Sequence, residues 1–149
     1  MRYLLDTGIL IRLPHRSDPI HEVVRQSLRA LTEDNHTFVT STQNIAEFWN
    51  VCTRPASARG GFGLSVDQTR KRLQLLERFI TVLREPDSAY KKWKSLLNTY
   101  KIQGKQVHDA RIASLMGAYR IKRILTLNPD DFDRYKGIEV FTPQDVTVS

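Results

Sequence analysis

Four segments of this chain carry acidic or amide side chains beside an expected strand end, where ligands and metals are commonly bound. The residues are Asp6, Glu47, Asp109 and the group Asn128, Asp130 and Asp131. In open parallel sheets, ligands bind beyond the carboxyl ends of the strands. We therefore expect these side chains to converge on one edge of a sheet. Several hard oxygen ligands, without paired histidine or cysteine, suit Mg²⁺ or Mn²⁺ rather than zinc.

Three of these acids also have a simpler structural interpretation when each is taken alone. Asp6 and Asp109 are both placed to cap a helix N-terminus, where a carboxylate accepts backbone hydrogen bonds. On a helical wheel, Glu47 lies opposite Ile45 and Trp49, which is typical of a solvated surface residue. The residues alone therefore leave a metal site and ordinary capping both open.

The remaining polar residues in these segments have equally simple alternatives. Asp130 and Asp131 follow Pro129, and aspartates at such positions are typical turn residues. His108 stands beside Asp109, which suggests acid–base chemistry. Nothing in the sequence pairs His108 with a nucleophile, so a supporting or surface role is favoured for it.

The elements that must position these residues alternate between strand and helix. The hydrophobic spacing predicts strands over residues 3–5, 37–40, 81–83, 123–126 and 139–141. It predicts helices over residues 7–13, 19–31, 42–51, 66–80, 87–100 and 107–119. This alternation predicts an α/β fold, three-layer α/β/α with a mostly parallel central sheet, as one domain over residues 1–149.

Capping and loop residues refine these elements. Asp18 is the expected N-cap of the second helix, with Pro19 as its first residue. Residues 54–64 contain three glycines and a proline and predict a mobile surface loop. Ser65 and Gln68 form a capping-box pattern at the start of the next helix. The residues of that helix expected to face inward are Val66, Leu73, Leu76 and Ile80.

The excess of basic residues suits either a polyanionic partner or simply a soluble basic protein. The chain has 23 Lys and Arg against 16 Asp and Glu, and from residue 88 to 123 nine basic residues accompany a single acid, Asp109. In a nuclease this would place a metal ligand among phosphate-binding cations, although solvated surface charge is the equal alternative. The candidates for contacting a phosphate backbone, which the family resemblance described below implies to be RNA, are Lys91, Lys92, Lys94, Lys105 and Arg111.

Cysteine content and hydropathy limit the classes of protein to which this chain can belong. The single cysteine, Cys52, cannot form an internal disulfide or a cysteine zinc site and is expected to be a buried small hydrophobe. No apolar run reaches the roughly 18 residues that a membrane helix needs, and the N-terminus lacks a signal-peptide pattern. We expect a cytoplasmic protein with no membrane partner.

Four segments resemble, in order and spacing, the PIN-domain nucleases, and come close to the VapC-like toxins of bacterial toxin–antitoxin pairs. They are LLDTGIL (4–10), STQNIAEFWNV (41–51), GKQVHDARIASLM (104–116) and ILTLNPDDFDRY (124–135), followed by the compatible GIEVFTP (137–143). The resemblance spans nearly the whole chain. Single motifs such as DTG are weak, whereas four in register are specific.

The resemblance implies a metal-dependent endoribonuclease that hydrolyses RNA phosphodiester bonds with a metal-activated water. It implies that Asp6, Glu47 and Asp109 bind Mg²⁺ or Mn²⁺. It also implies a homodimer and a small antitoxin that blocks the acidic site. The sequence shows neither interface; Phe48 and Trp49 suit the core or a dimer seam equally.

Two positions depart from the family pattern. Family members often have Asn or Ser after the DT pair, where this chain has Gly8. Members commonly place a polar or acidic residue after the fourth strand, and here that position is the amide Asn128. Asp131 is near enough in sequence to take its place. A second metal and full catalytic strength are therefore open.

Three other functions compete with this interpretation. The DTG triplet at residues 6–8 also occurs in aspartic proteases, but these need two copies in an all-β fold. Phosphatases with a strand-end aspartate typically have a second aspartate two positions later, where this chain has Gly8. A catalytically weak or inactive RNA-binding or partner-binding module on the same fold is the main alternative, because fold alone does not settle activity.

Overall fold

The computed structural model describes residues 1–148. Within them the chain forms five strands and seven α-helices. The strands are β1 (Arg2–Leu5), β2 (Thr37–Ser41), β3 (Ile80–Leu83), β4 (Arg123–Leu125) and β5 (Glu139–Phe141). The helices are α1 (Thr7–Arg12), α2 (His21–Glu33), α3 (Thr42–Thr53), α4 (Val66–Glu77), α5 (Asp87–Thr99), α6 (Gln106–Tyr119) and α7 (Pro143–Val148), with a 3₁₀ turn η1 at Pro129–Asp131.

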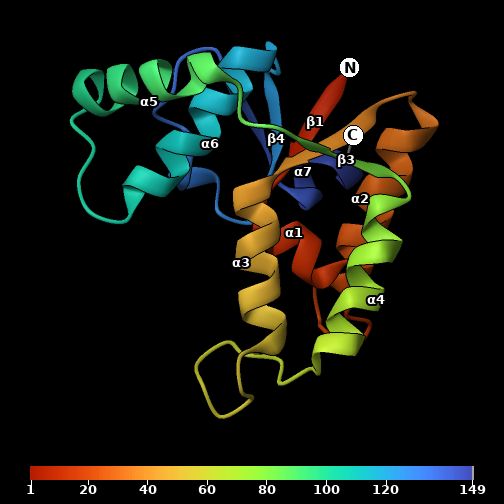
Figure 1. Ribbon diagram of the computed structural model, residues 1–149. Coiled ribbons are helices and arrows are strands. Elements are labelled where there is room, and N and C mark those ends of the chain that lie inside the picture. The colour runs from red at the N-terminus through yellow and green to blue at the C-terminus, as the bar shows by residue number, and fades with distance from the viewer. Residues whose placement is uncertain (149) are drawn as a thin grey trace.

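The strands form one fully parallel sheet in the order β3-β2-β1-β4-β5. In its centre, Leu4 is paired with Val39 on one side and with Ile124 on the other. Because all strands run the same way, their carboxyl ends share one edge. Figure 1 shows α1 and α3 starting near this edge, while α5 and α6 lie side by side on one flank. The predicted α/β/α fold with a parallel sheet is confirmed.

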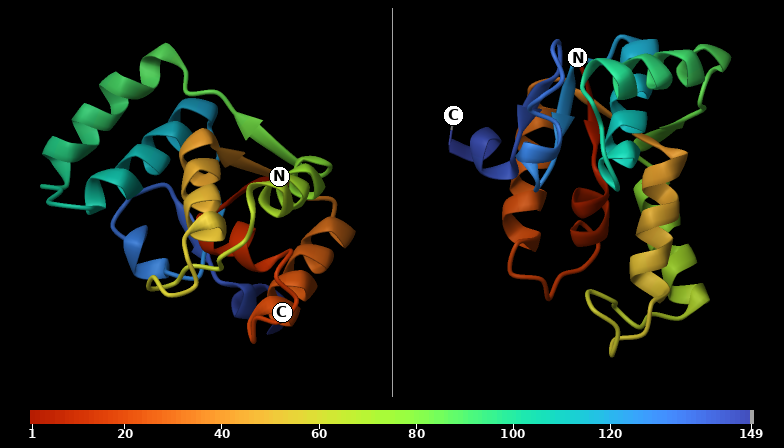
Figure 2. Two further views of the ribbon diagram at one scale, coloured as in Figure 1. Left: turned by 60° about the horizontal axis from the view of Figure 1, so that its bottom comes forward. Right: turned by 90° about the vertical axis from the view of Figure 1, so that its left-hand side faces the viewer.

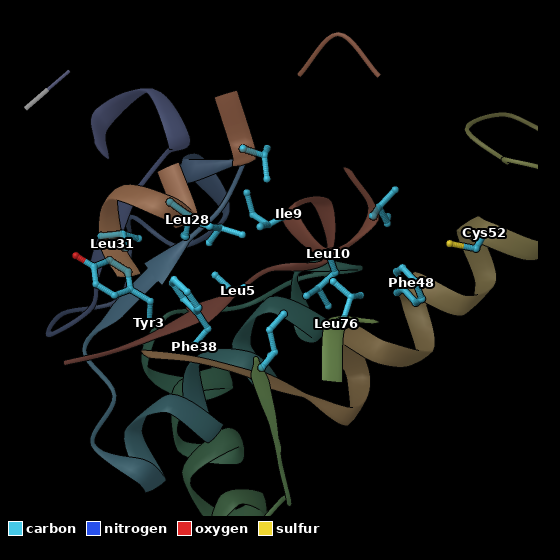
Figure 3. Packing of buried hydrophobic residues seen from close by; sticks show 14 residues of the cluster. Tyr3, Leu5, Ile9, Leu10, Leu28, Leu31, Phe38, Phe48, Cys52 and Leu76 are labelled. Atoms are coloured by element: carbon cyan, nitrogen blue, oxygen red, sulfur yellow. The ribbon is translucent and has the colours of Figure 1, made fainter. Parts of the chain in front are cut away.

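Alternation along the strands divides the core between the two faces of the sheet. Tyr3 and Leu5 of β1 join a cluster with residues of α1, α2, α3 and α4, whereas Leu4 joins a second cluster under α5 and α6. Successive strand side chains point to opposite faces, so both faces of β1 must be apolar. Figure 3 shows Tyr3 and Leu5 beside Leu28 and Leu31 in the first cluster.

Two local predictions about helices are corrected. Helix α2 begins at His21 with Ile20 as its N-cap, because Asp18 instead accepts a hydrogen bond from the Ile20 amide, 2.8 Å away, in the preceding turn. The capping box of Ser65 and Gln68 is confirmed at the start of α4. Val66, however, is 63% exposed rather than inward-facing, because Thr69 is the residue of the first turn of α4 that faces the core.

The second half of the loop between α3 and α4 is held in place by hydrogen bonds to α3. The amides of Phe62 and Leu64 donate to the carbonyls of Val51 and Cys52 at 3.1 and 2.8 Å. Phe62 stacks on the ring of His15 with centroids 4.0 Å apart. These contacts attach the loop to α3 and to the segment after α1, which Figure 2 shows at the same end of the molecule. The mobility of this loop stays a prediction, and these contacts restrain its second half.

Two further sequence expectations can be compared with the structure. Cys52 is a buried member of the first core cluster, as expected. None of the helices in residues 1–148 has both the length and the apolar character needed to cross a membrane.

Candidate functional site

Asp6 lies where β1 ends and α1 begins. It is the N-cap of α1, and its Oδ1 accepts a hydrogen bond from the Thr7 amide at 2.9 Å. Its Oδ2 accepts from the Thr126 hydroxyl at 2.7 Å, immediately after the neighbouring strand β4. The capping role suggested by sequence is thus real. It occupies only part of the carboxylate, which a second strand end also holds in place.

Glu47 lies on α3 and is tied to the same strand end. Its carboxylate accepts from the Thr7 hydroxyl at 2.6 Å and from the Gln43 side-chain amide at 3.2 Å. The expectation of a freely solvated Glu47 is wrong, because the residue is half-buried and hydrogen-bonded across elements.

The inward face of α3 differs from the predicted one. Asn44, Phe48 and Cys52 are its buried residues, while Ile45 and Trp49 are only partly buried. Asn44 connects the acids: its amide nitrogen lies 3.3 Å from Asp6 Oδ1 and 3.0 Å from Thr7 Oγ1. Its carbonyl oxygen accepts from Ser41, so a buried polar side chain is satisfied on every side.

Asp109 lies in the first turn of α6, whose N-cap is Lys105. The N-cap interpretation of Asp109 is therefore wrong. Burial raises the pKa of Asp109 to about 7, with further increases from the negative charges of Asp131, Asp6 and Glu47. Arg134 opposes this rise. A carboxyl group with this pKa stands among like charges that no nearby cation fully neutralises.

Burial likewise raises the pKa of Asp6 above its ordinary value. Hydrogen bonds from Thr126 and Thr7 oppose the rise, and the charges of Glu47 and Asp131 add to it. The same acids thus act on both Asp6 and Asp109. Asp6, Glu47, Asp109 and Asp131 form one electrostatic group at the carboxyl edge of the sheet, as the sequence predicted; we call it the acidic group.

Asn128 and Asp131 have different relations to this group. The backbone amide of Asn128 donates to the Thr126 hydroxyl at 3.0 Å, and its side chain makes no cap hydrogen bond to η1. Asp131 lies at the end of η1, and its charge raises the pKa of both Asp6 and Asp109. Asp131 therefore adds a fourth negative charge to the acidic group.

The acidic group fits a divalent cation by charge and by donor type. Among residues 1–148, no three Asp, Glu, His or Cys side chains stand close enough together to enclose a metal ion as placed. Nevertheless, besides the burial that chiefly raises the pKa of Asp109, the negative charges of Asp131, Asp6 and Glu47 act on it at this edge. Carboxylate oxygens are the ligands that Mg²⁺ and Mn²⁺ prefer. The side chains of the acidic group would have to move closer together around a cation to complete such a site.

The five basic residues predicted to contact RNA are not equivalent. The Arg111 guanidinium forms a bidentate ion pair with the Glu85 carboxylate, with hydrogen bonds of 2.6 and 3.0 Å. Lys94 lies 5.2 Å from the centre of the Tyr90 ring. Within residues 1–148, Lys91, Lys92 and Lys105 are exposed and form no ion pair. His108 is exposed, and its backbone carbonyl accepts from Gln43 at 3.0 Å.

Sequence reasoning missed the neutral residues that hold the acids. Thr7, Asn44 and Thr126 each contact Asp6, and Thr7 also contacts Glu47. A capping box between Ser41 and Asn44 fixes the position of Asn44, and its three-residue spacing was visible in the sequence. The contacts of Thr126 depend on the pairing of β1 with β4, which spacing alone does not reveal.

Comparisons with known proteins agree with this fold. The model of the PIN domain family matches residues 3–138. A search of curated protein sequences gives no significant match.

Among solved structures, the chain is similar to VapBC2 from Rickettsia felis bound to a promoter DNA fragment, with 18% identity, a TM-score of 0.70 and coverage of 95% of this chain and 98% of that one. It is similar to VapBC-1 from nontypeable Haemophilus influenzae, at 20% identity and a TM-score of 0.64, with coverage of 97% and 99%. It is also similar to VapC20 of Mycobacterium tuberculosis, a toxin that cleaves the sarcin–ricin loop, at 16% identity and a TM-score of 0.57, with coverage of 82% and 86%.

Proposed function

The chain belongs to the PIN domain family, and from that premise we propose that it is a cytoplasmic, Mg²⁺- or Mn²⁺-dependent endoribonuclease, the toxin of a toxin–antitoxin pair. The observation that carries the proposal is the pKa of about 7 of Asp109, raised first by burial and then by three neighbouring carboxylates. Such clustering of acids costs stability unless a cation neutralises it. Structural neighbours that include an RNA-cleaving toxin support the same function.

Asp6, Glu47 and Asp109 are the proposed metal ligands. A bound divalent cation would lower the pKa of a water molecule and polarise a phosphoryl oxygen, as in other metal-dependent phosphodiester hydrolysis. The chain's own residues would set the position of the carboxylates. Thr126 and Asn44 hold the two oxygens of Asp6, and Thr7 holds Glu47. These hydrogen bonds orient the acids before substrate binds.

Asp131 is the proposed fourth acid, with Asn128 holding the loop through its backbone. Calorimetric titration with Mn²⁺ distinguishes the two residues. We expect Asp131→Asn to weaken Mn²⁺ binding by about tenfold, which is the lower end of the usual effect of removing a group that supports metal ligands. Asn128→Ala keeps the backbone hydrogen bond to Thr126 and should bind Mn²⁺ nearly as the wild type does. The reverse order would assign the fourth position to Asn128.

The second candidate function is an inactive binding module on the same fold. It is favoured by the observation that no three potential ligands in residues 1–148 are assembled as a metal cage. The same titration separates the two functions. Saturable Mn²⁺ binding that Asp109→Asn removes supports the nuclease. Absence of Mn²⁺ uptake at millimolar concentration by a folded protein free of bound partner supports the binding module.

The toxin role predicts an antitoxin, because several neighbouring structures are complexes of toxin and antitoxin. On this chain, Leu75 and Phe79 are 50% and 47% exposed and border a cavity of about 450 Å³ that residues before and within α2 also line. Exposed apolar residues around a hollow are typical of a protein-binding surface.

The toxin role itself is tested by growth. Induced expression of the chain in bacteria should arrest growth, and Asp109→Asn should relieve the arrest at equal protein level.

A homodimer is also proposed. Phe48 is fully buried and belongs to the core, so it cannot form a dimer seam, whereas Trp49 is partly exposed. Light scattering at micromolar concentration should give the mass of two chains. A mass equal to one chain, 17.2 kDa, would remove the dimer from the proposal.

A further inference from the structure

A second hollow lies on the flank formed by α5 and α6, apart from the acidic group. The cavity measures about 460 Å³ and is lined by residues of α5, by the second half of α6 and the turn after it, and by residues 135–138. Its volume falls within the roughly 300–1,000 Å³ of ordinary ligand sites. Figures 1 and 2 show α5 and α6 running side by side along this flank.

The interior of the cavity is apolar and aromatic. Met116, Ile121 and Tyr135 are buried lining residues, and Tyr100 is partly buried beside them. The rings of Tyr100 and Tyr135 meet edge to face with centroids 5.1 Å apart. Tyr135 is only 3% exposed, and its hydroxyl has no hydrogen-bond partner among residues 1–148. A buried hydroxyl without a partner is unusual.

The mouth of the cavity is basic. Lys92, Arg120, Lys122 and Lys136 all line it and all are exposed. Within residues 1–148 none of these four cations forms an ion pair, and none of the described lining residues is acidic. Arg120 has a left-handed backbone, with φ of 57°, where glycine or asparagine is commoner at a helix end. Unpaired cations around an apolar hollow favour a ligand that is both flat and anionic.

We propose that this cavity binds one unpaired nucleotide of an RNA strand, with the base in the apolar interior and its phosphates on the basic mouth. This proposal rests on the proposed function, in which RNA is the substrate. Proteins recognise single-stranded RNA by stacking splayed bases on aromatic side chains while cations contact the backbone. The cavity provides both parts: the partly buried Tyr100, supported by the buried Tyr135, for the base, and four cations for the phosphates.

The cavity is placed to act together with the acidic group. Asp109 lies in the first turn of α6, and Gly117, which lines the cavity, lies near the end of the same helix. Their separation of eight positions along the helix corresponds to about 12 Å of axial rise. One continuous RNA strand can therefore contact both places. A nucleotide held in the cavity would fix which phosphodiester bond reaches the acidic group.

Gly117 allows the cavity to be filled without disturbing the core. A Cβ atom built at Gly117 meets no heavy atom within 4 Å, and the residue is exposed and helical. Substitution of a helical glycine usually favours the helix. Gly117→Leu should therefore fold and occupy the mouth of the cavity, and Gly117→Ala is the matched control that leaves most of the space open.

The experiment is a calorimetric titration of wild-type protein, in chelator, with nucleoside 5′-monophosphates, inorganic phosphate and an acidic leucine-containing peptide. We expect the nucleotides to bind more tightly than phosphate. Gly117→Leu should weaken nucleotide binding by about tenfold, a difference that titration resolves easily. Gly117→Ala should change it less than about twofold on the same scale.

A second pair of variants tests the cations. Lys122→Ala with Lys136→Ala removes two charges from the mouth, whereas Lys71→Ala with Arg78→Ala removes two from the exposed surface at α4. With a short single-stranded RNA in chelator, the first pair should reduce the slope of log K against log salt by about 1.4, because each neutralised phosphate of a single strand adds roughly 0.7 to that slope. The second pair should leave the slope unchanged.

Three results would overturn the proposal. They are nucleotide binding that Gly117→Leu leaves intact, equal binding of phosphate and nucleotides, and binding of the acidic peptide in place of nucleotides. The metal-dependent cleavage of RNA is measured separately with the same variants. Nucleotide binding that Gly117→Leu abolishes, in a protein that cleaves no RNA, would leave the cavity assignment standing while the nuclease fails. RNA cleavage by a protein whose cavity binds no nucleotide would leave the nuclease standing while the cavity assignment fails.

Discussion

The hydroxyl of Thr126 donates a 2.7 Å hydrogen bond to Asp6 Oδ2 and thereby joins the ends of the neighbouring strands β1 and β4 at the acidic group. Burial raises the pKa of Asp6, and this hydrogen bond partly offsets that rise. The same hydroxyl accepts from the Asn128 amide at 3.0 Å. One neutral side chain thus holds an acid and the start of the loop that carries Asp131.

Removal of this hydroxyl should shift the pH dependence of RNA cleavage. In Thr126→Val, Asp6 loses a donor and its pKa rises further, so a higher pH is needed to ionise it. We expect the acidic limb of the kcat profile to move to higher pH and kcat near neutrality to fall by about tenfold, comparable with the loss of one hydrogen bond to a charged group. Thr126→Ser retains both hydrogen bonds and should follow the wild-type profile. Identical profiles for the valine and serine variants would contradict this role.

The raised pKa of Asp109 predicts that the metal-free protein loses stability as pH rises. The ordinary pKa of an aspartate is about 3.9, and in the folded chain that of Asp109 is about 7. Between these values the folded protein holds a proton that the unfolded chain has released. Raising the pH through this window therefore lowers the free energy of unfolding, by on the order of 1–2 kcal/mol after allowance for solvent screening.

Urea denaturation in chelator at pH 5 and pH 8 measures this effect. Asp109→Asn cannot release the proton and should show a smaller difference between the two pH values than the wild type. Asp133→Asn, in the exposed turn after η1, controls for the loss of one negative charge. A wild-type difference equal to that of Asp109→Asn would mean that the pKa of Asp109 is not raised in the folded chain.

Lys105 and Arg111 were both expected to contact RNA, but their environments differ. Arg111 is engaged by Glu85 through two hydrogen bonds, whereas Lys105 is exposed at the start of α6. Lys105→Ala should reduce the salt slope of single-stranded RNA binding by about 0.7, the value of one phosphate contact. Arg111→Ala should leave the slope close to that of the wild type. Binding is measured in chelator, and an unchanged slope in Lys105→Ala would remove this lysine from the RNA path.

The sequence was sufficient for the fold because its local patterns agree with the final packing. The run Tyr3-Leu4-Leu5 is apolar throughout, as a strand covered on both faces requires, and Asp6 ends it at the edge where ligands bind. The acids Asp6, Glu47 and Asp109 were identified from their positions beside such strand ends and from the family motifs. Their electrostatic grouping follows from the parallel sheet.

The details that sequence missed depend on contacts between distant segments. Glu47 seemed solvated because a helical wheel describes one helix alone, whereas Thr7 reaches it from the start of α1. Asn44, three residues before Glu47, is buried against Asp6, a contact between α3 and the end of β1 that a helical wheel cannot show. The preference for Asp131 over Asn128 depends on the turn of η1, which no periodicity encodes. Side-chain partners across elements become visible only after the chain has folded.

The most direct test of the nuclease is cleavage of end-labelled structured RNAs by the purified chain, with Mg²⁺ or Mn²⁺ and with chelator. Wild-type protein and Asp133→Asn should cleave only with metal. Asp6→Asn and Asp109→Asn, shown by circular dichroism to be folded, should lose at least about a hundredfold in rate, as expected when a group that holds or positions the metal is removed. Cleavage that persists in both variants, or an absence of cleavage by folded, metal-loaded wild-type protein, would contradict the assignment of the acidic group as a nuclease site.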